Sequence, residues 1–356
     1  MAASRFAGGV HSGPIQPPTC TDKLLWDTWL SVFQLPVLTV ADELGLFGLL
    51  ASRAMPASEI ADSLAIGPRA AEAFLGMLTS LGFLVQHEGQ FGLTESSRNF
   101  LLPQSPFYWG GVMHGFRDNW PTPQGIKEAL QQDRLQVAPT IGEGAPNTEE
   151  WEKGEIDPVR AEHFTRLMHS HSFPAATGVA RHSLFQGRQR VLDVAGGSGC
   201  FCIALAAQYE HMQCTILELA PVCRLAEKYV KDYGLENRIS THAADMFRDP
   251  WPSGHDAIFF ANIFHDWTRE QCLDLARKAY SALPSGGYIF LHEMLLEDTK
   301  DGPLAAATFS MVMLLATKGK QFSASELDGL LTEAGFQDVS VIPTYAYYSL
   351  VSAKKP

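Results

Sequence analysis

The chain has 356 residues, of which 46% are hydrophobic and 19% are charged, and its net charge is −12. This length allows two domains with large cores, and the composition excludes an intrinsically disordered chain. The acidic balance, together with the lack of a run of Lys and Arg, argues against nucleic acid and anionic membranes as partners.

Residues 1–20 are rich in Gly, Pro and Ser, and we expect them to form a flexible lead without a signal peptide. Five of the six cysteines fall between residues 200 and 272, amid apolar residues and without the spacing of zinc ligands. Reduced core thiols are typical of a cytoplasmic protein, so we expect that location and no metal site. The longest uncharged run, 302–317, is shorter than a membrane span, so no membrane segment is expected.

Residues 21–105 are predicted to form a first domain. Apolar residues recur at helical spacing over 21–50, broken once at Pro36, which predicts a helix buried in its own domain or against another subunit. Two helices flanking a turn at 67–68 follow, and then a hairpin around Gly89. This order resembles a winged helix, which either binds DNA or mediates dimerisation. The segment has more acidic than basic residues and its second helix has no basic face, so dimerisation is favoured.

Residues 106–185 are predicted to be a mostly helical linker that contributes to an acceptor pocket. One of its helices places Phe164, Met168 and His171 on one face, which by default indicates core packing. From residue 186 to 356 strands and helices alternate, which predicts a doubly wound α/β domain with a largely parallel, Rossmann-like sheet. The expected strands are 189–195, 213–219, 238–245, 255–264, 287–295, 337–344 and 347–355.

The stretch VLDVAGGSG, residues 191–199, ends the first of these strands in a glycine loop. Glycines permit positive φ and let a backbone approach a ligand, and ligands of such sheets bind beyond the carboxyl ends of the strands. Cys202 stands where the dinucleotide fingerprint has its third glycine, and no P-loop lysine follows. Asp193 at this mouth would repel a pyrophosphate and suits a cation.

Acidic residues also end the next two strands. Glu218 stands where an acid binds two ribose hydroxyls. Asp245 can accept from an adenine amino group, with Met246 and Phe247 against the ring. Partners for ribose and adenine without a phosphate site fit S-adenosylmethionine, whose charged groups are a sulfonium, an ammonium and a carboxylate.

His265 follows the fourth strand of this domain and precedes Asp266 and Trp267. A phenol has a pKa near 10, so its methylation at neutral pH needs a base. Imidazole is suited to that task, and a neighbouring carboxylate fixes its tautomer and supports its charged form. The sequence therefore predicts a general base at the edge of the sheet that carries the glycine loop.

The segments VLDVAGGSG, ILEL, ADMF, NIFHDW, ALPSGGYIFLHE and LLTEAGF occur in this order. They resemble the class I methyltransferases of the plant caffeic-acid and animal acetylserotonin O-methyltransferase type, and the resemblance covers nearly the whole chain. It implies a Rossmann-like S-adenosylmethionine domain behind an all-helical winged-helix dimerisation domain. It also implies a homodimer that needs no metal.

The resemblance also implies roles for single residues. His265 would be the catalytic base, with Glu293 and Glu326 as acids that orient it. The cofactor-binding residues that it implies are Ser172, Gly197, Gly199, Glu218, Asp245 and Met246, to which the strand-end argument above adds Asp193 and Phe247. For the acceptor pocket it implies Phe164, Met168, Met311 and Met313. The aromatic composition adds Trp120, and we also place Asn262 there, which stands where relatives often carry Arg or Lys.

We therefore expect an S-adenosylmethionine-dependent O-methyltransferase that acts on a small aromatic or polyketide-like molecule of secondary metabolism. Aromatic and Met residues predict a flat, apolar acceptor without identifying it. Two alternatives stay open, namely methylation of an N or C atom and a non-methylating reaction that keeps the cofactor. A DNA-binding regulator is the third reading of the chain.

Overall fold

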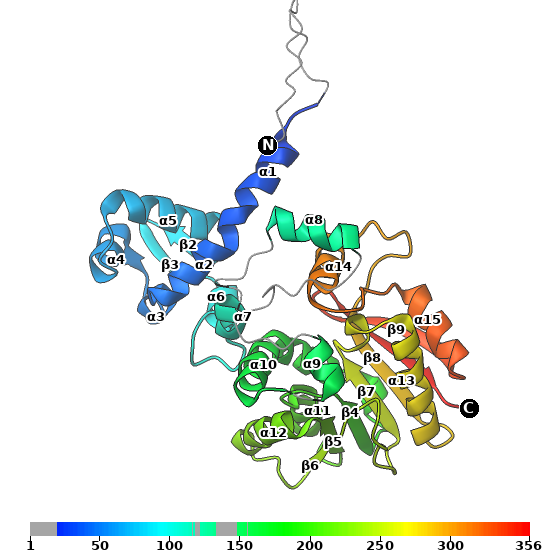
Figure 1. The fold of residues 1–356 in the computed structure, drawn as a ribbon. Helices are drawn as coiled ribbons and strands as arrows, with labels where there is room; N and C mark the ends of the chain where they lie inside the picture. The colour runs from blue at the N-terminus through cyan, green and yellow to red at the C-terminus, as the bar shows by residue number, and fades with distance from the viewer. Residues whose placement is uncertain (1–19, 116, 118–121, 133–147, 155) are drawn as a thin grey trace, which may run out of the picture.

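The computed structural model describes residues 20–115, 117, 122–132, 148–154 and 156–356 (Figure 1). Trp120, predicted to line the acceptor pocket, lies outside the described residues.

The N-terminal domain is built from short helices around a small sheet. Its elements are α2 (Gln34–Glu43), α3 (Leu46–Leu49), β1 (Met55–Pro56), α4 (Ala57–Ser63), α5 (Pro68–Ser80), β2 (Leu84–His87), β3 (Gln90–Leu93) and α6 (Glu95–Phe100). The predicted pair of helices and the hairpin are present, and the hairpin turns at Glu88 and Gly89, both with positive φ. The strand order β1-β3-β2 shows that the domain is not all-helical.

The first helix, α1 (Lys23–Leu30), projects from this domain and continues through the 3₁₀ turn η1 (Ser31–Phe33) into α2 (Figure 1). Pro36 lies in the first turn of α2, where its missing N–H weakens the helix just before it. No residue of α1 is buried, and Leu24, Leu25 and Trp29 are 77%, 72% and 60% exposed. The expectation that this helix is buried in its own domain is therefore wrong for α1. Within the described residues, Lys23–Glu43 is also the one helical stretch long and apolar enough to cross a membrane.

The helices between the two sheets are α7 (Gly110–Gly115), α8 (Pro123–Gln132), α9 (Thr148–Lys153), α10 (Pro158–Ala180) and the 3₁₀ turn η2 (Ser183–Phe185). Asp157 is the N-cap of α10, and its carboxylate accepts the backbone N–H groups of Val159 and Arg160. The Ser170 hydroxyl donates to the Tyr108 carbonyl, beside α7. Helix α10 also packs on α11 and α12 of the second domain, so it joins the two domains.

The C-terminal domain contains one seven-stranded sheet of order β6-β5-β4-β7-β8-β10-β9. Its strands are β4 (Arg190–Val194), β5 (Gln213–Glu218), β6 (Ile239–Ala243), β7 (Ala257–Ala261), β8 (Tyr288–Met294), β9 (Gln337–Tyr345) and β10 (Tyr348–Lys354). The first five run parallel and β10 is antiparallel to both of its neighbours. The seven predicted strands and the doubly wound fold are confirmed.

Helices cover both faces of this sheet. Its helical elements are α11 (Cys200–Gln208), α12 (Ala220–Asp232), the 3₁₀ turn η3 (Phe264–Asp266), α13 (Arg269–Ala282), α14 (Leu304–Ala316) and α15 (Ala324–Glu333). Adjacent residues of β4 show the two-sided burial, since Val191 packs in the core under α11 and α12 and Leu192 in the core under α13 and α15. The chain leaves β4 for β5 and later returns beside β4 with β7. In doubly wound sheets, ligands bind beyond the carboxyl ends of the strands at such a reversal of strand order.

Candidate active site

The glycine loop after β4 has the backbone that its sequence predicts. Gly197 and Gly199 have φ of +56° and +74°, values that L side chains rarely adopt. A Cβ on Gly199 would lie 2.3 Å from Ile216 Cδ1, so this glycine lets α11 approach β5 closely. A Cβ on Gly197 would meet no atom within 4 Å. Gly197 therefore presents bare backbone to open space, as a cofactor site requires.

Asp193 lies beneath this loop and not at an open mouth, because its residue is only 1% exposed. The Cys202 thiol donates to its Oδ2 at 3.5 Å, and a Cβ on Gly196 would lie 2.7 Å from its carboxyl carbon. Burial raises the pKa of Asp193 to about 7. The structure thus shows Asp193 supporting the loop from below, and direct contact with a cofactor stays a prediction.

Glu218 ends β5 and is 5% exposed. Its Oε2 accepts the backbone N–H of Leu219 at 2.6 Å, and the N–H of Gly197 also hydrogen-bonds the carboxylate. Burial raises the pKa of Glu218 to about 7, although the two backbone N–H groups oppose that shift. A buried acid is costly, and this one lies beside the glycine loop, where ribose hydroxyls would bind it.

The residues after β6 form a tight turn. Asp245 Oδ1 accepts the N–H groups of Phe247 and Arg248 at 2.8 and 3.2 Å, and its Oδ2 lies 3.1 Å from the Arg248 guanidinium. An adenine amino group would share this carboxylate with the turn. Met246 and Phe247 are half-buried, and Phe247 meets the ring of Trp267 edge-on at 4.8 Å.

Helix α9 lies next to this part of the site. A Cβ on Gly154, directly after α9, would lie 3.9 Å from both Asp245 Oδ2 and Leu219 Cδ2. The Phe164 ring contacts Trp151 of α9 at 5.7 Å between centroids. Phe164 therefore packs against α9 near the ends of β5 and β6. The sequence reasoning missed Trp151, because nothing in the acidic segment around it indicates this contact.

His265 lies in η3, directly after β7, and is 4% exposed. Its Nδ1 is 2.7 Å from Glu293 Oε2, and its Nε2 is 3.6 Å from Asp266 Oδ1. Burial alone would lower the pKa of His265, but the charges of Glu293 and Asp266 outweigh it and raise that pKa to about 9.

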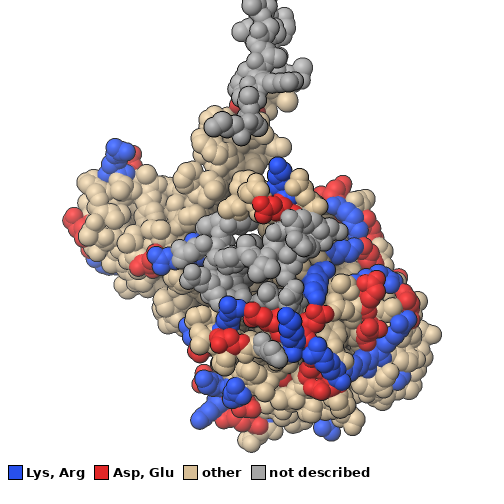
Figure 2. Space-filling model, viewed as in Figure 1, with Lys and Arg blue, Asp and Glu red and all other residues tan. Residues whose placement is uncertain are grey.

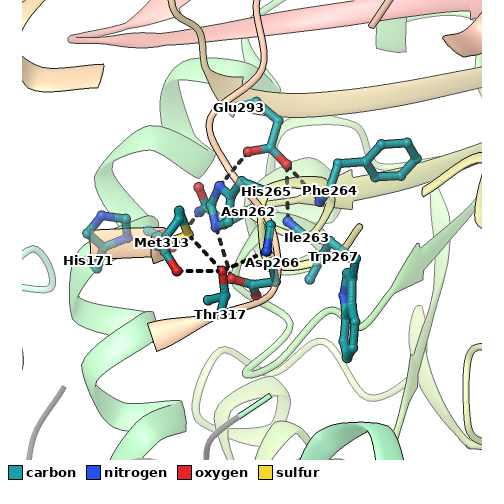
Figure 3. Close-up of polar contacts among 12 residues, drawn as sticks. His171, Asn262, Ile263, Phe264, His265, Asp266, Trp267, Glu293, Met313 and Thr317 are labelled. Carbon is teal, nitrogen blue, oxygen red and sulfur yellow. Dashed lines mark hydrogen bonds and ion pairs between the residues drawn. The ribbon is translucent and has the colours of Figure 1, made fainter. Parts of the chain in front are cut away.

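Glu293 also shapes the loop that carries the histidine. Figure 3 shows it between His265 and the Ile263–Phe264 backbone, whose N–H groups donate to Glu293 Oε1 at 3.1 and 3.0 Å. One carboxylate thus holds both the backbone and the imidazole ring in place.

The structure does not bring Glu326 to His265. The Glu326 carboxylate lies 2.5 Å from both Lys300 Nζ and Lys320 Nζ, and it accepts the backbone N–H of Ser323 at 2.9 Å. Ser323 and Glu326 form the capping box of α15. With its oxygens used in this way, Glu326 has a structural role, and Asp266 is the second acid beside the histidine.

Helix α14 packs against His265. Phe309 packs edge-on against His265 at 5.6 Å, and Met313 one turn later is buried and contacts the Thr317 hydroxyl. Met168 and Met311 are half-buried. A Cβ on Gly319 would lie 2.2 Å from the His265 carbonyl oxygen, so the chain after α14 packs directly on the loop that carries His265.

Helix α10 contacts both the glycine loop and the loop that carries His265. His169 Nδ1 lies 2.8 Å from the Ser198 hydroxyl in the glycine loop, a contact that sequence reasoning missed. Ser172 is buried and accepts a hydrogen bond from Asn262 Nδ2 at 3.4 Å. Asn262 has a φ of +56°, which asparagine tolerates, and it begins the loop that ends at His265. Among the described residues, no group of His, Cys, Asp or Glu is arranged to hold a metal ion.

Comparisons with known proteins agree with this arrangement. The O-methyltransferase domain family matches residues 124–337, and the O-methyltransferase dimerisation domain matches residues 26–103. The 3-hydroxy-5-methyl-1-naphthoate 3-O-methyltransferase of Streptomyces sahachiroi is 36% identical over 95% of each chain. The L-tyrosine C(3)-methyltransferase of Streptomyces lavendulae is 30% identical over 93% of this chain and 90% of its own.

A solved structure of human N-acetylserotonin methyltransferase in complex with S-adenosylmethionine has the same fold. It superposes with a TM-score of 0.78 over 96% of this chain and 99% of its own, at 24% identity. The buried carboxylate of Glu218 and the open backbone at Gly197 have the chemistry that the ribose and the methionine part of S-adenosylmethionine, in that order, would need. The chain belongs to the O-methyltransferase family and is an S-adenosylmethionine-dependent enzyme.

Proposed function

We propose that this enzyme methylates a hydroxyl group of a small aromatic or polyketide-like molecule, with His265 as the general base. The observation that carries the proposal is the buried His265–Glu293 pair, 2.7 Å apart, on the sheet edge that also holds the glycine loop. The relative that is 36% identical methylates the 3-hydroxyl of a naphthoate, which supports an acceptor of this class.

The geometry supports different tasks for the two nitrogens of His265. Nδ1 faces Glu293, so Nε2 is the atom that takes the proton of the acceptor hydroxyl. Glu293 and Asp266 then stabilise the imidazolium that forms. Bound S-adenosylmethionine supplies an electrophilic methyl group on its sulfonium. The apolar side chains of Phe309 and Met313 exclude water and hold a flat ring beside the base, and such alignment lowers the barrier.

The test is a product analysis with S-adenosylmethionine and a panel of hydroxynaphthoates, naphthols and matched aminonaphthalenes. We expect O-methylated products and one equivalent of S-adenosylhomocysteine. The relative that methylates C3 of tyrosine favours a carbon acceptor as second candidate. Methylation only on nitrogen or carbon, established by mass and NMR spectra of the products, would contradict the proposed acceptor atom.

The raised pKa of His265 predicts an alkaline pH profile. Below a pH of about 9 the imidazole of the empty enzyme is protonated and cannot act as a base, so kcat/KM should rise with pH up to about 9. In Glu293→Gln the main acid that raises this pKa is gone, so the same limb should shift to lower pH, with a lower plateau. Initial rates between pH 6 and 10 measure both curves. An unchanged limb in Glu293→Gln would exclude His265 as the titrating group.

We also propose that the enzyme is a homodimer that buries α1. The dimerisation domain match supports this, and the surface over α1 is mostly uncharged in Figure 2. In a Leu25→Lys, Trp29→Lys variant, buried charges should oppose association, so light scattering should give the mass of a monomer. Leu304→Lys, at an 82% exposed position on α14, is the control and should remain dimeric. A dimeric double variant would exclude this face.

A cytoplasmic location is proposed as well. Among the described residues five cysteines are buried and free, and Cys20 is exposed and free, which supports a reducing compartment.

A further inference from the structure

Three buried side chains and the half-buried His171, from three parts of the fold, form a closed hydrogen-bonded ring. Asn262, in the loop after β7, donates to the Ser172 hydroxyl at 3.4 Å and also hydrogen-bonds the Tyr348 hydroxyl. His171 Nε2 lies 3.2 Å from the Tyr348 hydroxyl, and His171 Nδ1 lies 3.2 Å from the Ser172 hydroxyl. Ser172, Asn262 and Tyr348 are 5%, 5% and 7% exposed. No role assigned above uses His171 or Tyr348.

The direction of each hydrogen bond in this ring is fixed by the Asn262 amide. An amide nitrogen can only donate, so the oxygens of Ser172 and Tyr348 accept from it. The Tyr348 hydroxyl then donates its own hydrogen bond to His171 Nε2. Burial and the charge of His265 lower the pKa of His171 to about 4, so the ring of His171 is neutral. With Nε2 as acceptor, its single proton is on Nδ1, which donates to Ser172.

The ring therefore makes Ser172 a donor. The Ser172 oxygen accepts hydrogen bonds from Asn262 and from His171, which occupy both of its lone pairs. The hydroxyl can therefore take part in a further hydrogen bond only as a donor. Ser172 lies one turn beyond His169, which binds Ser198 of the glycine loop. A hydroxyl that can only donate, one helical turn from this contact, matches an anionic group. The methionine carboxylate is the only anionic group of S-adenosylmethionine.

We propose that Tyr348 and His171 are positioning residues that direct the Ser172 hydroxyl onto the methionine carboxylate of the cofactor. The proposal rests on S-adenosylmethionine as the methyl donor and extends the site by two residues. The alternative is a ring that only packs α10 against β10. The positioning role predicts weaker binding only of ligands that carry the methionine part. The packing role predicts equal losses for all ligands that share adenine and ribose.

The experiment compares two probes by calorimetry, S-adenosylhomocysteine and 5′-methylthioadenosine, which lacks the amino acid part. Tyr348→Phe should weaken S-adenosylhomocysteine binding by about 3- to 10-fold, the worth of one hydrogen bond, and leave methylthioadenosine binding unchanged. Ser172→Ala should give the same selective loss, and the double variant no more than either single one, since both act through one contact. Tyr347→Phe is the matched control at a neighbouring tyrosine that is 61% exposed.

Equal losses for both probes in Tyr348→Phe would show a packing role and overturn the proposal. Unchanged S-adenosylhomocysteine binding in Tyr348→Phe, or additive losses in the double variant, would also overturn it. If the wild-type enzyme bound neither probe, the cofactor assignment itself would fall, and this result differs from every result that tests the ring alone.

Discussion

Replacing His265 with alanine is expected to lower kcat by about 10²- to 10⁴-fold, the usual contribution of a general base. His265 is a buried imidazole whose Nδ1 lies 2.7 Å from Glu293. A phenol would then have to lose its proton to water at neutral pH. Single-turnover rates with saturating acceptor measure the chemical step directly, and calorimetry with S-adenosylhomocysteine shows whether the cofactor site is intact.

The control for this prediction is His87→Ala, at an exposed histidine on β2, which should keep the wild-type rate. His265→Ala that retains nearly full activity would contradict the assigned base. Such a result would favour an acceptor that is nucleophilic without deprotonation, such as an amine. The L-tyrosine C(3)-methyltransferase among the relatives shows that the family also transfers methyl groups to carbon. The rate of this variant therefore decides between the classes of acceptor.

The sheet was predictable because its strands are short apolar runs that end in glycines or acids. Periodicity identifies such strands, and alternation with helices orders them as a parallel sheet. Gly199 was predictable for the same local reason, since its φ of +74° belongs to the turn between β4 and α11. What periodicity does not contain is contact between distant segments. The contact between the Trp151 and Phe164 rings and the hydrogen bond between His169 and Ser198 are of this kind.

Glu326 shows how a resemblance can override a local signal. The stretch Ser323 to Glu326 has the spacing of a capping box, in which the serine and the acid bond each other's backbone. That pattern was legible in the sequence and predicts a helix start, not an acid aimed at His265. The adjacent Asp266 was the better candidate, and it lies 3.6 Å from His265 Nε2.

Replacing Glu218 with alanine is expected to weaken S-adenosylhomocysteine binding by about 10²- to 10⁴-fold. Two ribose hydroxyls donating to one carboxylate make two charge-assisted hydrogen bonds, each worth about 1.5–3 kcal/mol. Since 1.4 kcal/mol corresponds to a tenfold change in affinity, the loss of both hydrogen bonds accounts for this range. Calorimetry measures the affinity, and Glu236→Ala, at an exposed acid after α12, is the control that should bind normally.

Stability and ligand choice make this prediction specific. The pKa of Glu218 is raised to about 7 by burial, so ionising it costs the fold free energy as pH rises through 7. Glu218→Gln should therefore melt at or above the wild-type temperature at pH 8 while binding the cofactor more weakly. Glu218→Gln should also weaken the binding of 5′-methylthioadenosine, because this ligand keeps the ribose. Tyr348→Phe should leave the binding of 5′-methylthioadenosine unchanged. A Glu218→Gln variant that binds both probes with wild-type affinity would exclude Glu218 as the residue that binds the ribose.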